Sequence, residues 1–113
     1  GVGNFSNVMN CFAKNFDLIK LKEEIDDKKI PILGICVGMQ LLASHGEEGG
    51  TTQGLNFIPG VVKHLRDLGC RERVPHVGWN DIHISVPNAL FGKLTNRSHF
   101  YFDHSYHYLG EEK

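Results

Sequence analysis

Apolar side chains recur at the spacing of α-helices in the first part of the chain. Between residues 6 and 28 they return every three or four positions, with a break at 15–17. The charged stretch KEEIDDKK, residues 22–29, provides the solvent-facing side. The pattern predicts two short helices or one kinked helix over 6–28, and both fit the sequence equally well.

The period changes at residues 29–35, where KIPILGI forms a short, continuous apolar run. Such a run is typical of a strand covered on both faces, as in a parallel sheet. After Cys36 the apolar residues return to helical spacing and predict a helix that ends near Gly46, followed by a polar, glycine-rich loop over 46–54. Helix, strand and helix in this order favour an α/β fold with a mainly parallel open sheet.

The second half of the chain carries patterns of strands and turns. LNFIPGVVKHL, residues 55–65, predicts two strands joined by a Pro-Gly pair, and the alternation in 78–86 predicts another strand. Residues 87–96 predict a turn or short helix, and the aromatic stretch 99–108 predicts a strand that runs into a loop. We interpret these elements as a β-rich insertion within a single domain spanning residues 1–113.

Length and composition narrow the class of function. With 113 residues, 41% of them hydrophobic and 22% charged, the chain has the make-up of one ordinary globular domain. A net charge of −1 gives no electrostatic basis for binding nucleic acid or a membrane surface, and no apolar run reaches a membrane span. The three widely spaced cysteines match neither a disulfide framework nor a zinc site, so we expect a cytoplasmic protein without metal.

Cys36 lies between Gly34 and Gly38, at the predicted change from strand to helix. This is the glycine spacing of a nucleophile elbow, a sharp turn that exposes its central side chain. Unpaired N–H groups at the start of the helix favour a thiolate, and the N–H of Val37 would face an oxyanion formed by attack of the sulfur on a carbonyl. A buried structural cysteine is the alternative, and this pattern alone does not decide between the two.

Several further stretches occur in the same order as in class I glutamine amidotransferases. They are GVGNF, GICVGMQLL, EEGG, IPGVV, VPHVGWN and YFDHSYH. Over nearly its whole length the chain resembles this family, most of all its glutaminase subunits of imidazole glycerol phosphate synthase. The resemblance implies a flavodoxin-like sheet flanked by helices.

The resemblance also implies an activity. The glutaminase subunits of this family hydrolyse glutamine through a cysteine thioester, and the ammonia passes to a separate (β/α)8-barrel cyclase in histidine biosynthesis. It therefore implies L-glutamine as substrate, a heterodimer with the cyclase or synthase subunit, and no cofactor. Two alternatives stay open: a paralogous subunit that supplies ammonia for amination of a surface-polysaccharide sugar, and a non-catalytic, amidotransferase-like binding module.

The resemblance assigns roles to individual residues. Cys36 is the implied nucleophile, and backbone groups of Val2, Gly3 and Val37 form the implied oxyanion site. The residues implied to bind glutamine are Gly1, Gln40, Glu48, His104, Ser105 and Tyr106. Those implied to face the partner are Pro75, His76, Gly78, Trp79 and Asn80. For Trp79 the alternative is a core indole, and for Glu48 a solvated loop carboxylate.

The general base of the family is a histidine in a His-Pro-Glu motif, which this sequence lacks. His104 is a poor substitute because neighbouring strand residues point to opposite faces, so Asp103 could not orient its ring. The chain also begins without a methionine and stops at YLGEEK with no terminating element. We expect a piece of a longer protein, truncated at both ends, whose 113 residues alone show near-background glutaminase activity.

Overall fold

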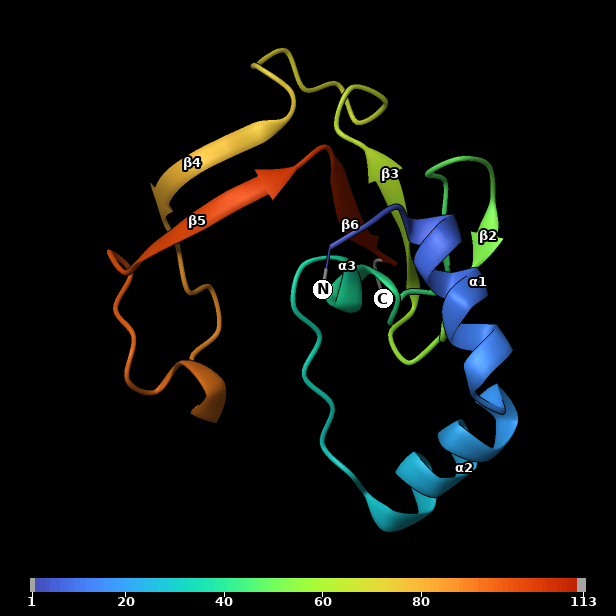
Figure 1. Cartoon of the computed structure of the whole chain (residues 1–113). Helices are drawn as coiled ribbons and strands as arrows, with labels where there is room; N and C mark the ends of the chain where they lie inside the picture. The colour runs from blue at the N-terminus through green and yellow to red at the C-terminus, as the bar shows by residue number, and fades with distance from the viewer. Residues whose placement is uncertain (1, 112–113) are drawn as a thin grey trace. The chain divides into compact units, whose positions relative to one another are not determined.

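The structure, a computed structural model, describes residues 2–111 and contains two compact units. The first unit comprises residues 2–70 and 106–111, and the second unit comprises residues 71–105. Figure 1 labels most of the helices and strands of the two units. None of the helices within the described residues combines the length and apolar character needed to cross a membrane.

Two short helices open the first unit, α1 (Phe5–Asn15) and α2 (Leu18–Lys28). Of the two alternatives that the sequence left open, two short helices or one kinked helix, the structure shows two helices. Each helix begins at a polar cap. The side chain of Asn4 accepts a hydrogen bond from the N–H of Asn7 at the start of α1, and the side chain of Asp17 accepts one from the N–H of Lys20 at the start of α2. The break between the helices follows from the cap at Asp17, because an N-cap residue lies outside helical backbone geometry.

The apolar segment 29–35 is not a strand, so that prediction is wrong for the described residues. Leu33 and Ile35 are 65% and 67% exposed instead of buried. The strands of the described chain form two sheets, and this segment belongs to neither. A strand is stabilised by hydrogen bonds and burial that adjacent strands supply, and an apolar sequence alone provides neither.

The helix after Cys36, α3 (Val37–Gln40), has only four residues and does not continue to Gly46 as predicted. The carbonyl groups of the turn that follows are engaged elsewhere: the oxygens of residues 41–43 accept hydrogen bonds from the N–H groups of residues 55–58. Those carbonyls are therefore unavailable for another helical turn. The same bonds hold 55–58 as an irregular segment, where a strand was predicted.

A four-stranded sheet in the order β2-β1-β3-β6 completes the first unit. The strands are β1 (His45–Gly46), β2 (Thr52–Gln53), β3 (Gly60–His64) and β6 (Tyr106–Gly110). β1 and β3 are parallel, whereas the β1–β2 and β3–β6 pairs are antiparallel. The α/β class is confirmed, with mixed strand pairing in the described residues. β6 occupies the stretch predicted as a loop.

The hydrophobic core gathers around α1 and the residues that follow Cys36. Its buried side chains are Phe5, Met9, Val37, Leu41, Ala43 and Val62, all in the first unit. Val37 is 3% exposed, so the residue next to Cys36 is anchored in this core.

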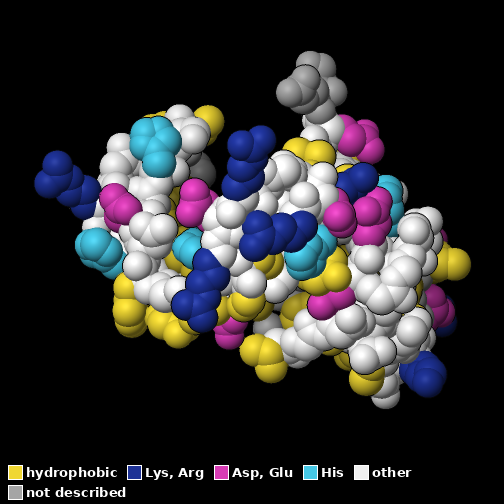
Figure 2. Space-filling model, turned by 90° about the horizontal axis from the view of Figure 1, so that it is seen from above, with side chains coloured by type: hydrophobic (Ala, Val, Ile, Leu, Met, Phe, Trp, Pro, Cys, Tyr) yellow, Lys and Arg dark blue, Asp and Glu magenta, His cyan; other side chains and the backbone are white. Residues whose placement is uncertain are grey.

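The second unit is a two-stranded antiparallel ribbon of β4 (His76–Asp81) and β5 (His99–His104). The predicted strand over 78–86 begins two residues earlier and ends at Asp81. A 3-10 helix, η1 (Ala89–Phe91), confirms the predicted turn or short helix. The chain has 12 basic and 13 acidic residues, and Figure 2 shows acidic, basic and histidine side chains on the face in view.

Candidate active site

Cys36 occupies a strained turn at the start of α3, with an exposed thiol. Its φ of 55° and ψ of −123° lie outside the regions that L-residues ordinarily occupy. Such a conformation costs on the order of 1–3 kcal/mol and is found mainly at functional sites. The exposed thiol excludes the alternative of a buried structural cysteine.

Local packing and hydrogen bonds enforce this turn. A side chain at Gly34 would place its Cβ 2.5 Å from the Cα of Met39, so the close approach of the two backbones requires glycine. The carbonyl of Cys36 accepts hydrogen bonds from the N–H groups of Met39 and Gln40, at 3.0 and 3.2 Å. With Val37 buried on the other side, the sulfur is held outward by backbone contacts that do not involve it.

The N–H of Val37 is available for an oxyanion. No acceptor for it occurs among the described residues, whereas the next N–H, that of Gly38, donates to the carbonyl of Ile35 at 3.0 Å. Because α3 is only one turn long, its helix dipole is small. Negative charge next to Cys36 would therefore be stabilised mainly by the N–H of Val37.

Gln40 lies four positions after Cys36 and connects α3 to β6. Its side chain is only 8% exposed, and its Nε2 donates to the carbonyl of Tyr106 across 3.4 Å. The structure therefore gives Gln40 a fixed orientation in the first unit. It is not a solvated surface glutamine.

Tyr106 and Glu48 lie close enough to interact electrostatically. Burial raises the pKa of the Tyr106 hydroxyl above its ordinary value of about 10, and the negative charges of Glu48 and Asp67 raise it further. The Oε2 of Glu48 accepts a hydrogen bond of 2.8 Å from the N–H of Phe5. Glu48 is thus a fixed carboxylate, although it lies in a loop that the sequence shows as polar and glycine-rich.

Of the three residues at the opening turn, Gly1 lies outside the described part of the chain. Val2 is exposed, and Gly3 has a φ of 141°, a value that favours glycine. A Cβ at Gly3 would lie 2.7 Å from the Cγ2 of Val8 in α1. Glycine is therefore required where this turn meets α1.

His104 and Ser105 belong to the second unit. The Nε2 of His104 lies 3.0 Å from the Nδ1 of His76, directly across the ribbon, and the ring of His76 stacks on Phe102. Asp103 is exposed while His104 is partly buried, as expected for alternating strand residues. The structure thus gives Asp103 no role in orienting the imidazole of His104.

The predicted interface residues fall on two faces of the ribbon. Alternation along β4 separates Trp79 from His76, Gly78 and Asn80. Trp79 is 73% exposed, so it is not a core indole in the described residues. It meets Tyr101 edge-on with ring centres 5.6 Å apart, a contact that the sequence analysis missed. Strand alternation in HFYFDH was the signal that could have found it.

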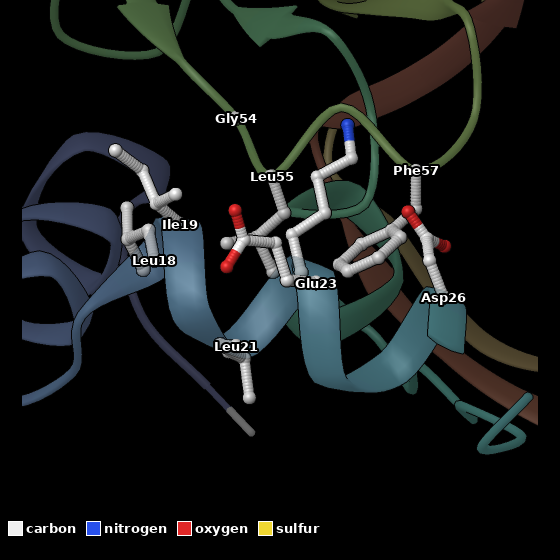
Figure 3. A pocket seen from close by; sticks show the side chains of 9 residues that line it. Leu18, Ile19, Leu21, Glu23, Asp26, Gly54, Leu55 and Phe57 are labelled. Carbon is white, nitrogen blue, oxygen red and sulfur yellow. The ribbon is translucent and has the colours of Figure 1, made fainter. Parts of the chain in front are cut away.

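Two surface pockets lie away from the thiol. One of about 370 Å³ lies between α2 and segment 54–57 (Figure 3). There the Nζ of Lys22 donates to the carbonyl of Asn56 and lies 5.7 Å from the ring centre of Phe57. The other, of about 600 Å³, follows α1. Cys36 lines neither pocket, so neither adds to the candidate site.

The described residues thus form an α/β protein with an exposed, strained cysteine at the start of a helix and an unpaired N–H beside it. The chain belongs to the glutamine amidotransferase class-I family, whose model matches residues 1–111. The family resemblance drawn from the sequence is thereby confirmed.

Individual relatives share a common name. The chain is 44% identical over 108 residues to imidazole glycerol phosphate synthase subunit HisH 1 of Campylobacter jejuni, and the aligned region covers 95% of this chain and 53% of the relative. It is 41% identical over 113 residues to subunit HisH of Moorella thermoacetica, covering 100% and 52%. It is 42% identical over 115 residues to subunit HisH of Methanocaldococcus jannaschii, covering 99% and 54%. The chain spans about half the length of the curated relatives it matches.

Proposed function

We propose that this chain carries the nucleophile and the glutamine-binding half of a glutaminase subunit of imidazole glycerol phosphate synthase. The protein would hydrolyse L-glutamine to glutamate and ammonia, and the ammonia would pass to a (β/α)8-barrel cyclase subunit in histidine biosynthesis. Two observations support this: sequence identity of 41–44% to synthase subunits along nearly the whole chain, and the geometry at Cys36. We propose a cytoplasmic heterodimer that needs no cofactor.

The proposed reaction follows from the turn at Cys36. The thiolate attacks the side-chain amide carbon of glutamine, and the carbonyl oxygen becomes an oxyanion that the N–H of Val37 and the turn at Val2 and Gly3 stabilise. Collapse of this intermediate breaks the C–N bond, the nitrogen takes up a proton, and ammonia leaves. Water then cleaves the thioester to release glutamate and the thiol. We assign the general base to none of the described residues.

Substrate selection is assigned to the fixed polar groups of the first unit. The carboxylate of Glu48 is suited to the ammonium group of glutamine, and the side chain of Gln40 and the backbone at Tyr106 provide polar partners for the rest of the amino-acid moiety. Each is held by contacts already described, so little side-chain entropy is lost on binding. From the family resemblance, we further propose that His104 and Ser105 bind glutamine.

The second unit is assigned to the partner. Trp79 and Tyr101 form an exposed aromatic pair, and aromatic side chains are enriched at the centre of protein interfaces. We propose that Trp79 contacts the cyclase subunit together with Pro75, His76, Gly78 and Asn80. Since these residues lie on more than one face of the ribbon, the partner would have to reach its edge as well as its aromatic side.

The observation that carries the proposal is the exposed thiol of Cys36 at a positive φ. Its test is labelling of the full-length protein with a diazo ketone analogue of glutamine, with peptide mass spectrometry to locate the adduct. We expect one adduct at Cys36, slowed by added glutamine. Cys11 is the matched control, because it is also exposed but lies within α1. Equal labelling of both cysteines, unaffected by glutamine, would contradict the proposal.

A further inference from the structure

The carboxylate of Glu48 is bound to the first turn of α1, 43 positions away in the sequence. Its Oε2 accepts the N–H of Phe5, the first residue of the helix and one of the N–H groups that a helix leaves without an internal partner. A carboxylate at this position also interacts favourably with the positive end of the helix dipole. Among the described residues, no hydrogen-bond partner occurs for the other oxygen, Oε1.

Further contacts hold the loop around Glu48 against the same turn. The hydroxyl of Ser6 donates to the backbone carbonyl of Glu48 across 2.9 Å and also meets the hydroxyl of Thr52. The ring of Phe5 is fully buried and lies so close to Gly46 that a Cβ there would be 2.7 Å from it. The loop and the start of α1 therefore form one packed assembly.

The start of α1 in turn fixes the residues that precede it. Gly3 lies two positions before Phe5, and a Cβ there would lie 2.7 Å from the Cγ2 of Val8 in α1. A shift of the first helical turn would therefore reach Gly3 through the short backbone segment that joins it to Phe5. These contacts connect the carboxylate of Glu48 to the turn assigned to the oxyanion.

We propose that Glu48 is a positioning residue for the oxyanion turn at Val2 and Gly3, in addition to its proposed role as acceptor for the substrate's ammonium group. The inference rests on the proposed glutaminase function. One carboxylate oxygen holds the N–H of Phe5, and the other faces the substrate. Binding of glutamine and placement of the oxyanion donors are thus linked through a single side chain.

Two substitutions in the full-length protein separate these roles. Glu48→Gln keeps the length of the side chain and an oxygen that can accept the N–H of Phe5, but removes the charge. We expect KM for glutamine to rise about tenfold, because a charged hydrogen bond to the substrate is lost, with kcat close to wild type.

Glu48→Asp keeps the charge but shortens the side chain by one methylene, so the carboxylate no longer reaches the N–H of Phe5. We expect kcat to fall about tenfold, since donors made for the transition state are displaced. We also expect hydrogen exchange at the amide of Phe5 to accelerate by about tenfold. This readout is independent of catalysis. Glu47→Gln is the matched control, because Glu47 pairs with Lys63 at the surface and should change neither quantity.

The inference would be overturned if both variants raised KM alone and left exchange at Phe5 as in the wild type. That result would leave Glu48 as a substrate acceptor only. A different result would contradict the proposed function itself: a wild-type protein that neither hydrolyses glutamine nor forms the Cys36 adduct. The wild type therefore tests the function, and the comparison of the two Glu48 variants tests the positioning role.

Discussion

The two units of the chain are stabilised by different means. The first unit has a closed core, in which Phe5, Ala43 and Val62 are fully buried. The second unit contributes no fully buried hydrophobic residue among those described, and its ribbon leaves Trp79 and Tyr101 mostly exposed. An isolated two-stranded ribbon is marginally stable in water, so the second unit depends on its surroundings more than the first does.

This difference matches the tasks we propose for each unit. A nucleophile must be held in one geometry, and Cys36 is held by the buried Val37 next to it and by backbone hydrogen bonds on either side. A surface that recognises another protein needs accessible aromatic groups, and Trp79 and Tyr101 supply them. The comparison can be tested unit by unit.

The largest effect is expected at the thiol. Cys36→Ser in the full-length protein should lower glutamine hydrolysis by at least about a thousandfold, because a neutral hydroxyl is a far weaker nucleophile than a thiolate. Release of glutamate measures this loss. Cys11→Ser, at the other exposed cysteine of the first unit, should remain near wild type. Similar losses in both variants would show that the thiol turn has no special role.

The next effect separates the stability of the two units. Phe5→Ala empties a fully buried site in the first unit and should reduce the free energy of unfolding by about 3–5 kcal/mol, as measured by urea denaturation. Trp79→Ala removes a larger side chain from an exposed site and should change it by less than about 0.5 kcal/mol. If both variants lost a similar free energy of unfolding, Trp79 would contribute to stability despite its exposed position.

The same tryptophan should matter once the partner is present. Trp79→Ala is expected to weaken association with the cyclase subunit by about 2 kcal/mol, the effect typical of a central aromatic residue at an interface. Isothermal titration of separately purified subunits measures it. Tyr101→Phe, which keeps the ring beside Trp79, is the conservative control. Unchanged affinity in the Trp79 variant would place the interface elsewhere.

Local signals in the sequence indicated the first two helices and the exposed turn at Cys36. The helices followed from apolar spacing, and Asn4 and Asp17 cap them within three residues of their partners, so both starts depend on nearby residues. The spacing of Gly34, Cys36 and Gly38 is equally local, and the structure shows the exposed, strained cysteine that this spacing indicates.

Features set by distant residues were not predictable in this way. The apolar segment 29–35 has the composition of a strand, but a strand exists only where another pairs with it. The early end of α3 depends on hydrogen bonds from residues 55–58, and the bond between Glu48 and Phe5 joins positions 43 apart. Only the resemblance singled out Glu48, and it gave no sign of the residue's hold on α1.

The smallest predicted effect is a pH dependence confined to the first unit. Burial, then the charges of Glu48 and Asp67, raise the pKa of Tyr106 in the folded state, so the folded protein retains this proton at a pH where the unfolded chain releases it. Stability is therefore unaffected below about pH 10 and falls as the pH rises toward the folded pKa. Urea denaturation between pH 9 and 11 should show this decline, and Tyr106→Phe should make it shallower. Tyr101→Phe in the second unit controls for the loss of a tyrosine hydroxyl, and an equal slope in wild type and the Tyr106 variant would contradict the assignment.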